Sequence, residues 1–282
     1  MGTSRSSTGS PSGVPLVPPW ADSVEPSSDD NSPTESEADN GDSGEDPQEK
    51  KPESDAEPLA PPARFRSTRT SLGKFASSGD KNAMRQGVGR YVKTGLGGSR
   101  TATRRLSGTA RAAGSLYAAL GGKSVSAREG RALDAALLQG RSAREIINVV
   151  IEIACPVNGT QDAEASRNSI NDALSDLLQT FPDADLLDLS EEQRLFVIER
   201  FVGMDVYRRF ILDVGNTIQT KAGSATVALA RMKEVRDYIR ETVSASFRKL
   251  SQTGQALNGM KISQFVSRAL SDSLDVFAGY AE

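Results

Sequence analysis

The sequence predicts an all-α protein in which a disordered N-terminal tail and an acidic linker precede a helical, bundle-like domain. From about residue 64 onward, apolar side chains recur every three to four positions, as they do on one face of a helix. No stretch alternates convincingly between apolar and polar residues, and residues 21–62 hold almost no large apolar side chain. These observations divide the chain into a motif tail, an acidic linker, a basic Gly/Arg-rich, partly helical segment and an α-helical domain: residues 1–20, 21–62, 63–125 and 126–282.

The first two segments lack the residues that build a core. The tail opens with "MGTSRSSTGSPSG", and residues 21–62 contain 14 Asp and Glu against 2 Lys, with Pro and Ser throughout. Such a segment cannot bury enough surface to offset its chain entropy, so we expect it to be disordered. Its simplest role is a solvating spacer with an end separation of about 35 Å, and the alternative is an intramolecular mask over the basic segment.

The basic segment reverses the sign of the charge. Residues 63–130 contain 14 Lys and Arg against Asp80 and Glu129. The stretch from Gly95 to Gly122 has a narrow apolar stripe with arginines on its other side, which indicates a helix. Two glycines inside it each cost about 1 kcal/mol relative to alanine, so the helix needs a partner or the downstream domain. The arginines are candidate contacts for nucleic acid or for an acidic protein surface: Arg100, Arg104, Arg105 and Arg111.

Five helices are expected in the last segment. "RSAREIINVVIEIACP" begins with the capping box of Ser142 and Glu145 and ends at Pro156. Its β-branched residues would also suit a buried strand, but the spacing of three to four favours a helix. The four later apolar stripes are Ile170, Ala173, Leu174, Leu177, Leu178 and Phe181; Leu195, Ile198, Val202, Val206 and Phe210; Met232, Val235, Ile239, Val243, Phe247 and Leu250; and Ile262, Phe265, Val266, Ala269, Leu270, Leu274 and Phe277.

Composition argues against most enzyme classes. The chain has no histidine and one cysteine, so it lacks the usual general base, the commonest metal ligand and any CxxC-type zinc site. Cys155 precedes a proline after an apolar run, which indicates a buried, inert thiol. The acidic residues around Asp185 suit a solvated turn, and no phosphate-binding loop is present. We therefore expect no enzymatic activity, no metal and no cofactor.

The N-terminus suggests a modification site instead. Removal of the initiator methionine would leave the α-amine on Gly2, the one residue type without a Cβ. The start also fits the loose myristoylation pattern M-G-x-x-x-[ST], although one myristoyl chain gives only marginal membrane binding. No stretch is long and apolar enough for a membrane span, and the start lacks the layout of a signal peptide. We expect a soluble, cytoplasmic protein without membrane contact.

Four stretches together resemble one known family. "MGTSRSSTGSPSGVPLVPPW", "YVKTGLGGSRTATRRLSGTARAAG", "VVIEIACPVNGTQDAEASRNSINDAL" and "VIERFVGMDVYRRFILDVGNTIQ" are similar, in that order, to segments of the QatB family of the bacterial Qat anti-phage defence system. The resemblance implies a non-enzymatic component that acts with three partners: a QatA-like ATPase, the QueC-like enzyme QatC and the TatD-like nuclease QatD.

The resemblance also implies a role for the tail. A QueC-like enzyme would activate a carboxylate with ATP and join it to an amine, and the amine of Gly2 is a sensible acceptor, with Thr3 and Ser4 recognised beside it. Two classes of function stay open at this point. The protein is either a scaffold and N-terminal modification substrate, or a nucleic-acid-binding and sensing module that uses residues 63–125.

Overall fold

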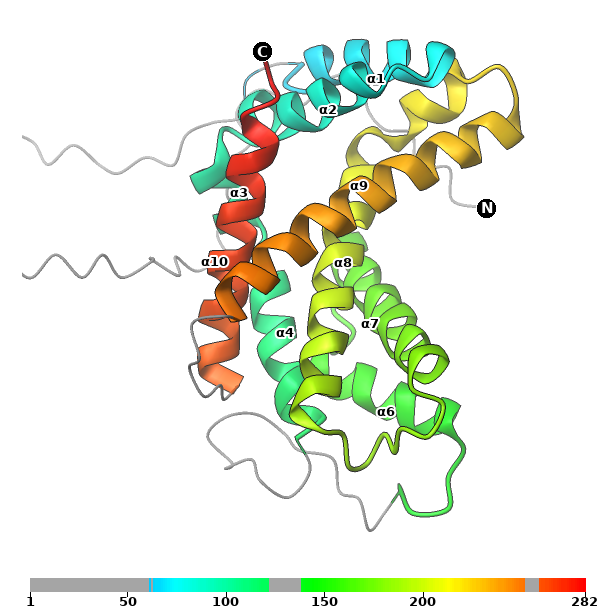
Figure 1. Cartoon of the computed structure of the whole chain (residues 1–282), viewed down its shortest axis with the longest axis vertical. Coiled ribbons are helices and arrows are strands. Elements are labelled where there is room, and N and C mark those ends of the chain that lie inside the picture. The colour runs from blue at the N-terminus through cyan, green and yellow to red at the C-terminus, as the bar shows by residue number, and fades with distance from the viewer. Residues whose placement is uncertain (1–60, 62, 122–137, 252–258) are drawn as a thin grey trace, which may run out of the picture.

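The computed structural model describes residues 61, 63–121, 138–251 and 259–282. Within these ranges the chain forms nine α-helices and one π-helical turn, with no strand, so the predicted all-α class is confirmed (Figure 1). The elements are α1 (Arg66–Ser78), α2 (Lys81–Arg90), η1 (Tyr91–Gly95), α3 (Ser99–Arg105), α4 (Ser107–Ala119), α6 (Ala143–Ala154), α7 (Gln161–Thr180), α8 (Glu191–Lys221), α9 (Ala225–Ser251) and α10 (Gly259–Ala278).

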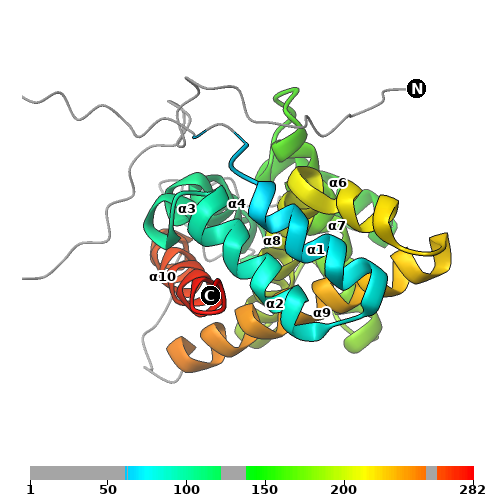
Figure 2. The ribbon, with the colours of Figure 1, turned by 90° about the horizontal axis from the view of Figure 1, so that it is seen from above.

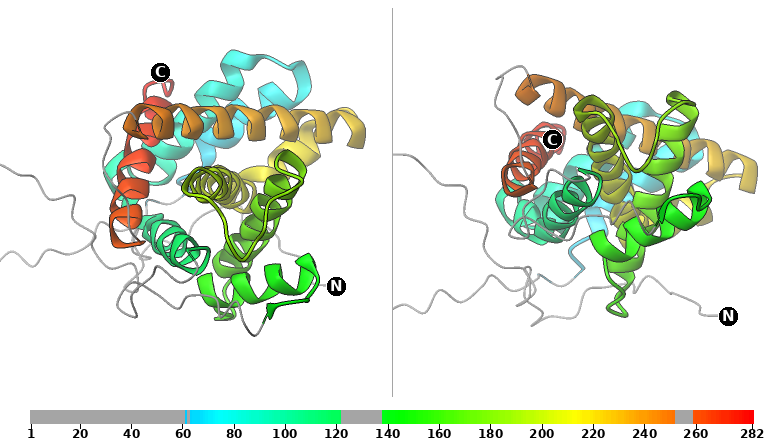
Figure 3. Two further views of the ribbon diagram at one scale, coloured as in Figure 1. Left: turned by 60° about the horizontal axis from the view of Figure 1, so that its bottom comes forward. Right: turned by 90° about the horizontal axis from the view of Figure 1, so that it is seen from below.

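Helix α8 organises the bundle. It contacts α7, α9, α1 and α4, and α1 and α2 lie across one end of the molecule, as the view from above shows (Figure 2). Helix α4 lies alongside α10 (Figure 3). One hydrophobic cluster extends from Phe65 to Phe277 and takes residues from every described helix. The helices before and after residues 122–137 therefore share a single core.

The capping signals in the sequence set the starts of three helices. Ser142 and Glu145 form the predicted capping box of α6, so the helix prediction is confirmed and the strand alternative is wrong. Thr160 caps α7 through a hydrogen bond that its hydroxyl accepts from the amide of Ala163. Ser190 forms a second capping box with Gln193 at the start of α8. Each cap satisfies amides that a helix start leaves without partners.

The four later apolar stripes are confirmed as buried faces. Ile239 and Phe247 of α9 are 1% and 3% exposed, and Ile262, Val266, Ala269, Leu270, Leu274 and Phe277 of α10 are buried as well. Phe265, in the same predicted stripe, is partly buried. Helix α8 buries a broader surface than its predicted stripe, because it has neighbours on several sides. Leu195, near its start, is only half-buried.

The basic segment departs from its predicted form. The expected single helix from Gly95 to Gly122 is two helices, α3 and α4, which meet at Leu106. Gly97 and Gly98 have φ values of 82° and 92°, a conformation that favours glycine and makes a turn before α3. Helix α4 does not present an arginine-rich face, because α10, α6 and α8 pack around it. Its small Ala, Gly and Ser side chains allow this close approach.

The start of the bundle also binds the end of the described chain. Arg90 of α2 donates from Nε to the carbonyl oxygen of Ala281 at 3.2 Å, and Gln86 donates from Nε2 to the carbonyl oxygen of Glu282 at 3.0 Å. Lys93 forms an ion pair with the Glu282 side chain at 3.3 Å. Gly89 provides the space for this contact, since a Cβ there would lie 2.6 Å from the carbonyl oxygen of Phe277.

Candidate functional site

A line of charged residues runs along the inner face of α8 at intervals of four: Asp205, Arg209 and Asp213. The Asp205 side chain is 0% exposed. Its Oδ2 accepts from the Thr109 hydroxyl of α4 at 2.5 Å, and its Oδ1 accepts from the Ser166 hydroxyl of α7 at 2.8 Å. The carboxylate therefore connects three helices at the centre of the bundle.

Arg209 supplies the positive charge of this network. Its Nε donates to Asp205 Oδ2 at 3.0 Å, and its Nη1 donates to the Asp162 carboxylate at the start of α7. Burial acts to lower the pKa of Arg209, but the two carboxylates raise it above the ordinary value. The guanidinium is thus a permanent cation between two anions, and this arrangement fixes the relative positions of α7 and α8.

The other end of the line involves the π-helical turn. Tyr91, the first residue of η1, donates its hydroxyl hydrogen to Asp213 Oδ2 at 2.8 Å. Burial, followed by the Asp213 charge, raises the pKa of Tyr91 well above its ordinary value, so the phenol keeps its proton. Burial also raises the pKa of Asp213, which the Tyr91 hydrogen bond and the charges of Arg105 and Arg64 oppose. π-Helical turns often mark functional sites.

Replacing Tyr91 with phenylalanine should lower the free energy of unfolding by about 1.5 kcal/mol at pH 7, because it removes a hydrogen bond to a charged group. The raised pKa of Asp213 means that the folded state holds this proton more tightly than the unfolded state. Stability from this group therefore falls as the pH rises from about 3.9, the unfolded value, through the folded value. Without the phenol the folded pKa rises further, so the deficit grows between pH 3 and pH 7.

Urea unfolding of both proteins at pH 3, 5 and 7 measures this effect. Tyr207→Phe is the matched control, since the Tyr207 hydroxyl is half-buried and has no hydrogen-bond partner in the described ranges. A Tyr91→Phe deficit that is the same at all three pH values would contradict the coupling to Asp213.

An open pocket of about 460 Å³ lies beside the network, within the size range of small-molecule sites. Asp162, Ser166 and Arg209 belong both to the network and to the pocket wall. The opposite wall comes from α4, where Arg111 is exposed and Gly108 and Ser115 are half-buried. The pocket therefore gives solvent access to one side of the buried charges.

Cys155 also lines this pocket. Its side chain is half-buried rather than fully buried, and its Sγ lies 3.7 Å from the carbonyl oxygen of Ala163. Burial and the nearby Asp205 charge raise the pKa of the thiol. A raised thiol pKa lowers the thiolate fraction at neutral pH and agrees with the predicted low reactivity.

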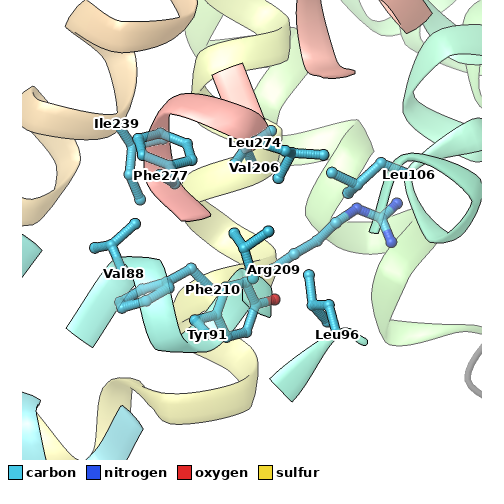
Figure 4. A pocket seen from close by; sticks show the side chains of 11 residues that line it. Val88, Tyr91, Leu96, Leu106, Val206, Arg209, Phe210, Ile239, Leu274 and Phe277 are labelled. Atoms are coloured by element: carbon cyan, nitrogen blue, oxygen red, sulfur yellow. The ribbon is translucent and has the colours of Figure 1, made fainter. Parts of the chain in front are cut away.

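A second, much smaller cavity lies on the apolar side of the same network. Figure 4 shows Phe210, Leu274 and Phe277 around it, with the Arg209 guanidinium directed away from Phe277. Its volume is about 10 Å³, the lower limit for one water molecule. This space is a small packing gap and offers no room for a ligand.

The structure separates the four arginines that the sequence grouped. Arg100 is exposed and Arg104 is half-exposed on α3, and neither forms an ion pair with another described residue. Arg105 lines a small pocket together with Asp213 and Tyr91, and its positive charge acts to lower the pKa of both Asp213 and Arg64. Arg111 lies on α4, at the pocket. The predicted modification site at Gly2, Thr3 and Ser4 lies outside the described residues.

Sequence reasoning missed the charged line on α8. The sequence does contain a sign of this line, because Asp205, Arg209 and Asp213 are spaced by four residues and therefore share one helical face. The neighbouring residues Val202, Val206 and Phe210 already marked that side as buried. The partners on α4, α7 and η1 come from distant parts of the chain and have no such signal.

In the part of the chain that the structure describes, none of the helices has the length and apolarity to cross a membrane. Among the same residues, no group of three or more His, Cys, Asp and Glu side chains is placed to hold a metal ion.

Comparison with known proteins identifies the family. The model of the Qat anti-phage system associated protein QatB matches residues 97–277, from the turn before α3 to the last turn of α10. No curated protein and no solved structure matches the chain. Helices α1 and α2 lie outside the matched range although they contribute to the same core. The match covers most of the sequence, and the chain belongs to the QatB family of proteins associated with the Qat anti-phage defence system.

Proposed function

We propose that this chain is a non-enzymatic scaffold of the Qat system and that its N-terminal Gly2 is a modification substrate of a QueC-like partner enzyme. The observation that carries this proposal is the separation of the chain into a helical body with one shared core and a long N-terminal extension of different composition. The body suits docking on the other components, a QatA-like ATPase and a QatD-like nuclease. The extension suits presentation of its first residues to QatC in the cytoplasm.

The proposed reaction forms an amide bond at Gly2. A QueC-like enzyme would activate a carboxylate by attack of its oxygen on the α-phosphorus of ATP, which forms an acyl adenylate and releases pyrophosphate. The Gly2 amine then attacks the activated carboxyl carbon, AMP leaves, and the amine loses a proton. Because Gly2 has no Cβ, a narrow active site can close around its amine, while Thr3 and Ser4 provide small polar groups for recognition beside it.

The ion pairs favour a scaffold over a nucleic-acid-binding module. Several cations of the basic segment are occupied within the protein: Lys74 pairs with Asp80, and Lys93 pairs with Glu282. Arg90 is bonded to Ser71 and Ala281. Phosphate binding needs many cations on one accessible surface. The cations that are paired within the protein are less available for phosphate.

Mass spectrometry of the N-terminal peptide tests the proposal. The protein is purified alone and after co-expression with the QueC-like enzyme, and its intact and peptide masses are compared. We expect an added mass on the peptide that begins with Gly2, only in the co-expressed sample. Gly2 deletion should abolish the addition and the protection against phage, whereas Gly13→Ala, in the same tail, should leave both unchanged.

Two results would contradict this function. An unmodified N-terminal peptide in both preparations would exclude the substrate role. The nucleic-acid-binding alternative predicts a different set of results. The charge reversals Arg100→Glu and Arg104→Glu together would abolish protection, DNA binding would be sensitive to salt, and Gly2 deletion would leave protection normal. Circular dichroism of this double variant verifies that the helices still form.

A further inference from the structure

We propose that the acidic segment, residues 21–62, binds the helical body of its own chain at a cationic face. This face consists of the start of α1 and the whole of α3, and its cations are Arg64, Arg66, Arg100, Arg104 and Arg105. The proposal concerns an intramolecular interaction surface and does not depend on modification of Gly2.

The charge distribution provides the first argument. The described residues carry a net charge of +7, and residues 1–60 carry −11. Within 63–121 there are 12 Lys and Arg and a single acid, Asp80. The body therefore has an excess of positive charge in its first helices, and the chain itself contains the complementary charge in adjoining sequence.

The distribution of ion pairs shows which cations of the body have no acidic partner among the described residues. Lys74 and Lys93 are paired with acids of the body. By contrast, Arg66, Arg100 and Arg104 form no ion pair with any residue that has a described position, and Arg66 and Arg100 are exposed. Exposed cations without such a pair also occur elsewhere, for example Lys81 on α2. The start of α1 and α3 differ in that Arg64, two residues after the acidic segment, lies close to Arg105 at the end of α3.

Arg64 and Arg105 show that cations are crowded here. The pKa of Arg64 is lowered by burial and by the positive charge of Arg105. The Nε and Nη1 atoms of Arg64 are shielded from solvent and have no hydrogen-bond acceptor among the residues that the structure describes. Asp213 is the acid beside both guanidiniums, and one of its oxygens already accepts from Tyr91. Additional carboxylates would relieve this repulsion.

The connection along the chain favours this occupant over a separate acidic partner. Glu57 is seven residues before Arg64, so its carboxylate starts at most about 24 Å of extended chain away. A segment tethered so closely has an effective concentration in the millimolar range, so even weak contacts form to a large extent. Because exposed charges are involved, the interaction should disappear as salt shortens the Debye length from about 10 Å at 0.1 M to about 3 Å at 1 M.

Zero-length carbodiimide cross-linking of the full chain tests this interaction. The reagent joins a carboxylate to an amine, so Arg104→Lys introduces a reactive group into the cationic face without changing its charge. Arg144→Lys is the matched control, because Arg144 is an exposed arginine at the start of α6 without an ion pair to a described residue. Peptide mass spectrometry of the monomer then identifies the joined residues.

We expect the Arg104→Lys protein to give cross-links to peptides of residues 21–62 in far higher yield than the Arg144→Lys protein, and to lose them at 1 M salt. Replacing six acids by their amides should abolish these cross-links and increase the hydrodynamic radius at low salt: Glu45, Asp46, Glu49, Glu53, Asp55 and Glu57. Equal yields from the two lysine variants would overturn the proposal. Cross-links found only in a covalent dimer would overturn it in favour of a second copy of the chain.

Discussion

Asp205→Ala should lower the free energy of unfolding by about 3–5 kcal/mol, the loss typical of breaking a buried ion pair by removing one partner. The Asp205 side chain is 0% exposed and accepts hydrogen bonds from Thr109, Ser166 and Arg209. Without it, the Arg209 guanidinium keeps only the partly exposed Asp162 as a counter-charge. Two hydroxyl groups also lose their acceptor inside the bundle.

Urea unfolding at pH 7, monitored by circular dichroism, measures this loss. Asp237→Ala is the control, because Asp237 is a half-exposed acid of α9 that pairs with Lys233, and such pairs contribute at most about 1 kcal/mol. In an Arg209→Met background the effect of Asp205→Ala should become smaller, since no buried cation is left uncompensated. Equal losses for Asp205→Ala and Asp237→Ala would show that the buried network does not stabilise the fold.

Gly89→Val should lower the free energy of unfolding by about 3 kcal/mol, at the upper end of the usual effect of overpacking. A Cβ at Gly89 would lie 2.6 Å from the carbonyl oxygen of Phe277 and 2.7 Å from the amide nitrogen of Ala281. These atoms are backbone and cannot rotate away as a side chain can. The added methyl groups would push α2 and the end of α10 apart and weaken the hydrogen bond between Arg90 and Ala281.

The measurement combines thermal unfolding with hydrogen exchange at residues 275–282. Gly223→Val is the matched control, because nothing lies within 4 Å of a Cβ at Gly223, and a surface substitution of this kind should change stability by less than about 0.5 kcal/mol. Gly89→Ala should give an intermediate loss. If Gly89→Val left both stability and exchange unchanged, the close approach of α2 and α10 would be wrong.

Local signals explain why much of the helical fold could be predicted. Ser142 with Glu145 fixes the start of α6, and Val235, Ile239 and Val243 give α9 its buried face through spacing alone. Such signals lie within one helix and need no knowledge of its neighbours. Such signals are weaker for α4, because helices pack on most of its sides and leave only a narrow polar face around Arg111.

The candidate site could not be assembled from sequence for a different reason. Tyr91 and Asp213 are 122 residues apart, and Thr109 and Asp205 are 96 residues apart. Counting charges along the chain grouped four arginines, but only the packing determines that Arg105 faces Asp213 while Arg100 faces solvent. The sequence thus predicted a net positive charge on this segment, but it could not predict which of the arginines are exposed to a binding partner.

The contacts between α2 and the end of α10 have a consequence for the order of folding. Hydrogen bonds between residues 191 and 196 positions apart close the bundle, and α4 packs on the distant α10 as well as on the nearby α6. Contacts of such long range form late, and a protein is synthesised from its N-terminus. The core that the first helices share with α10 is therefore completed only after the last helix has been synthesised.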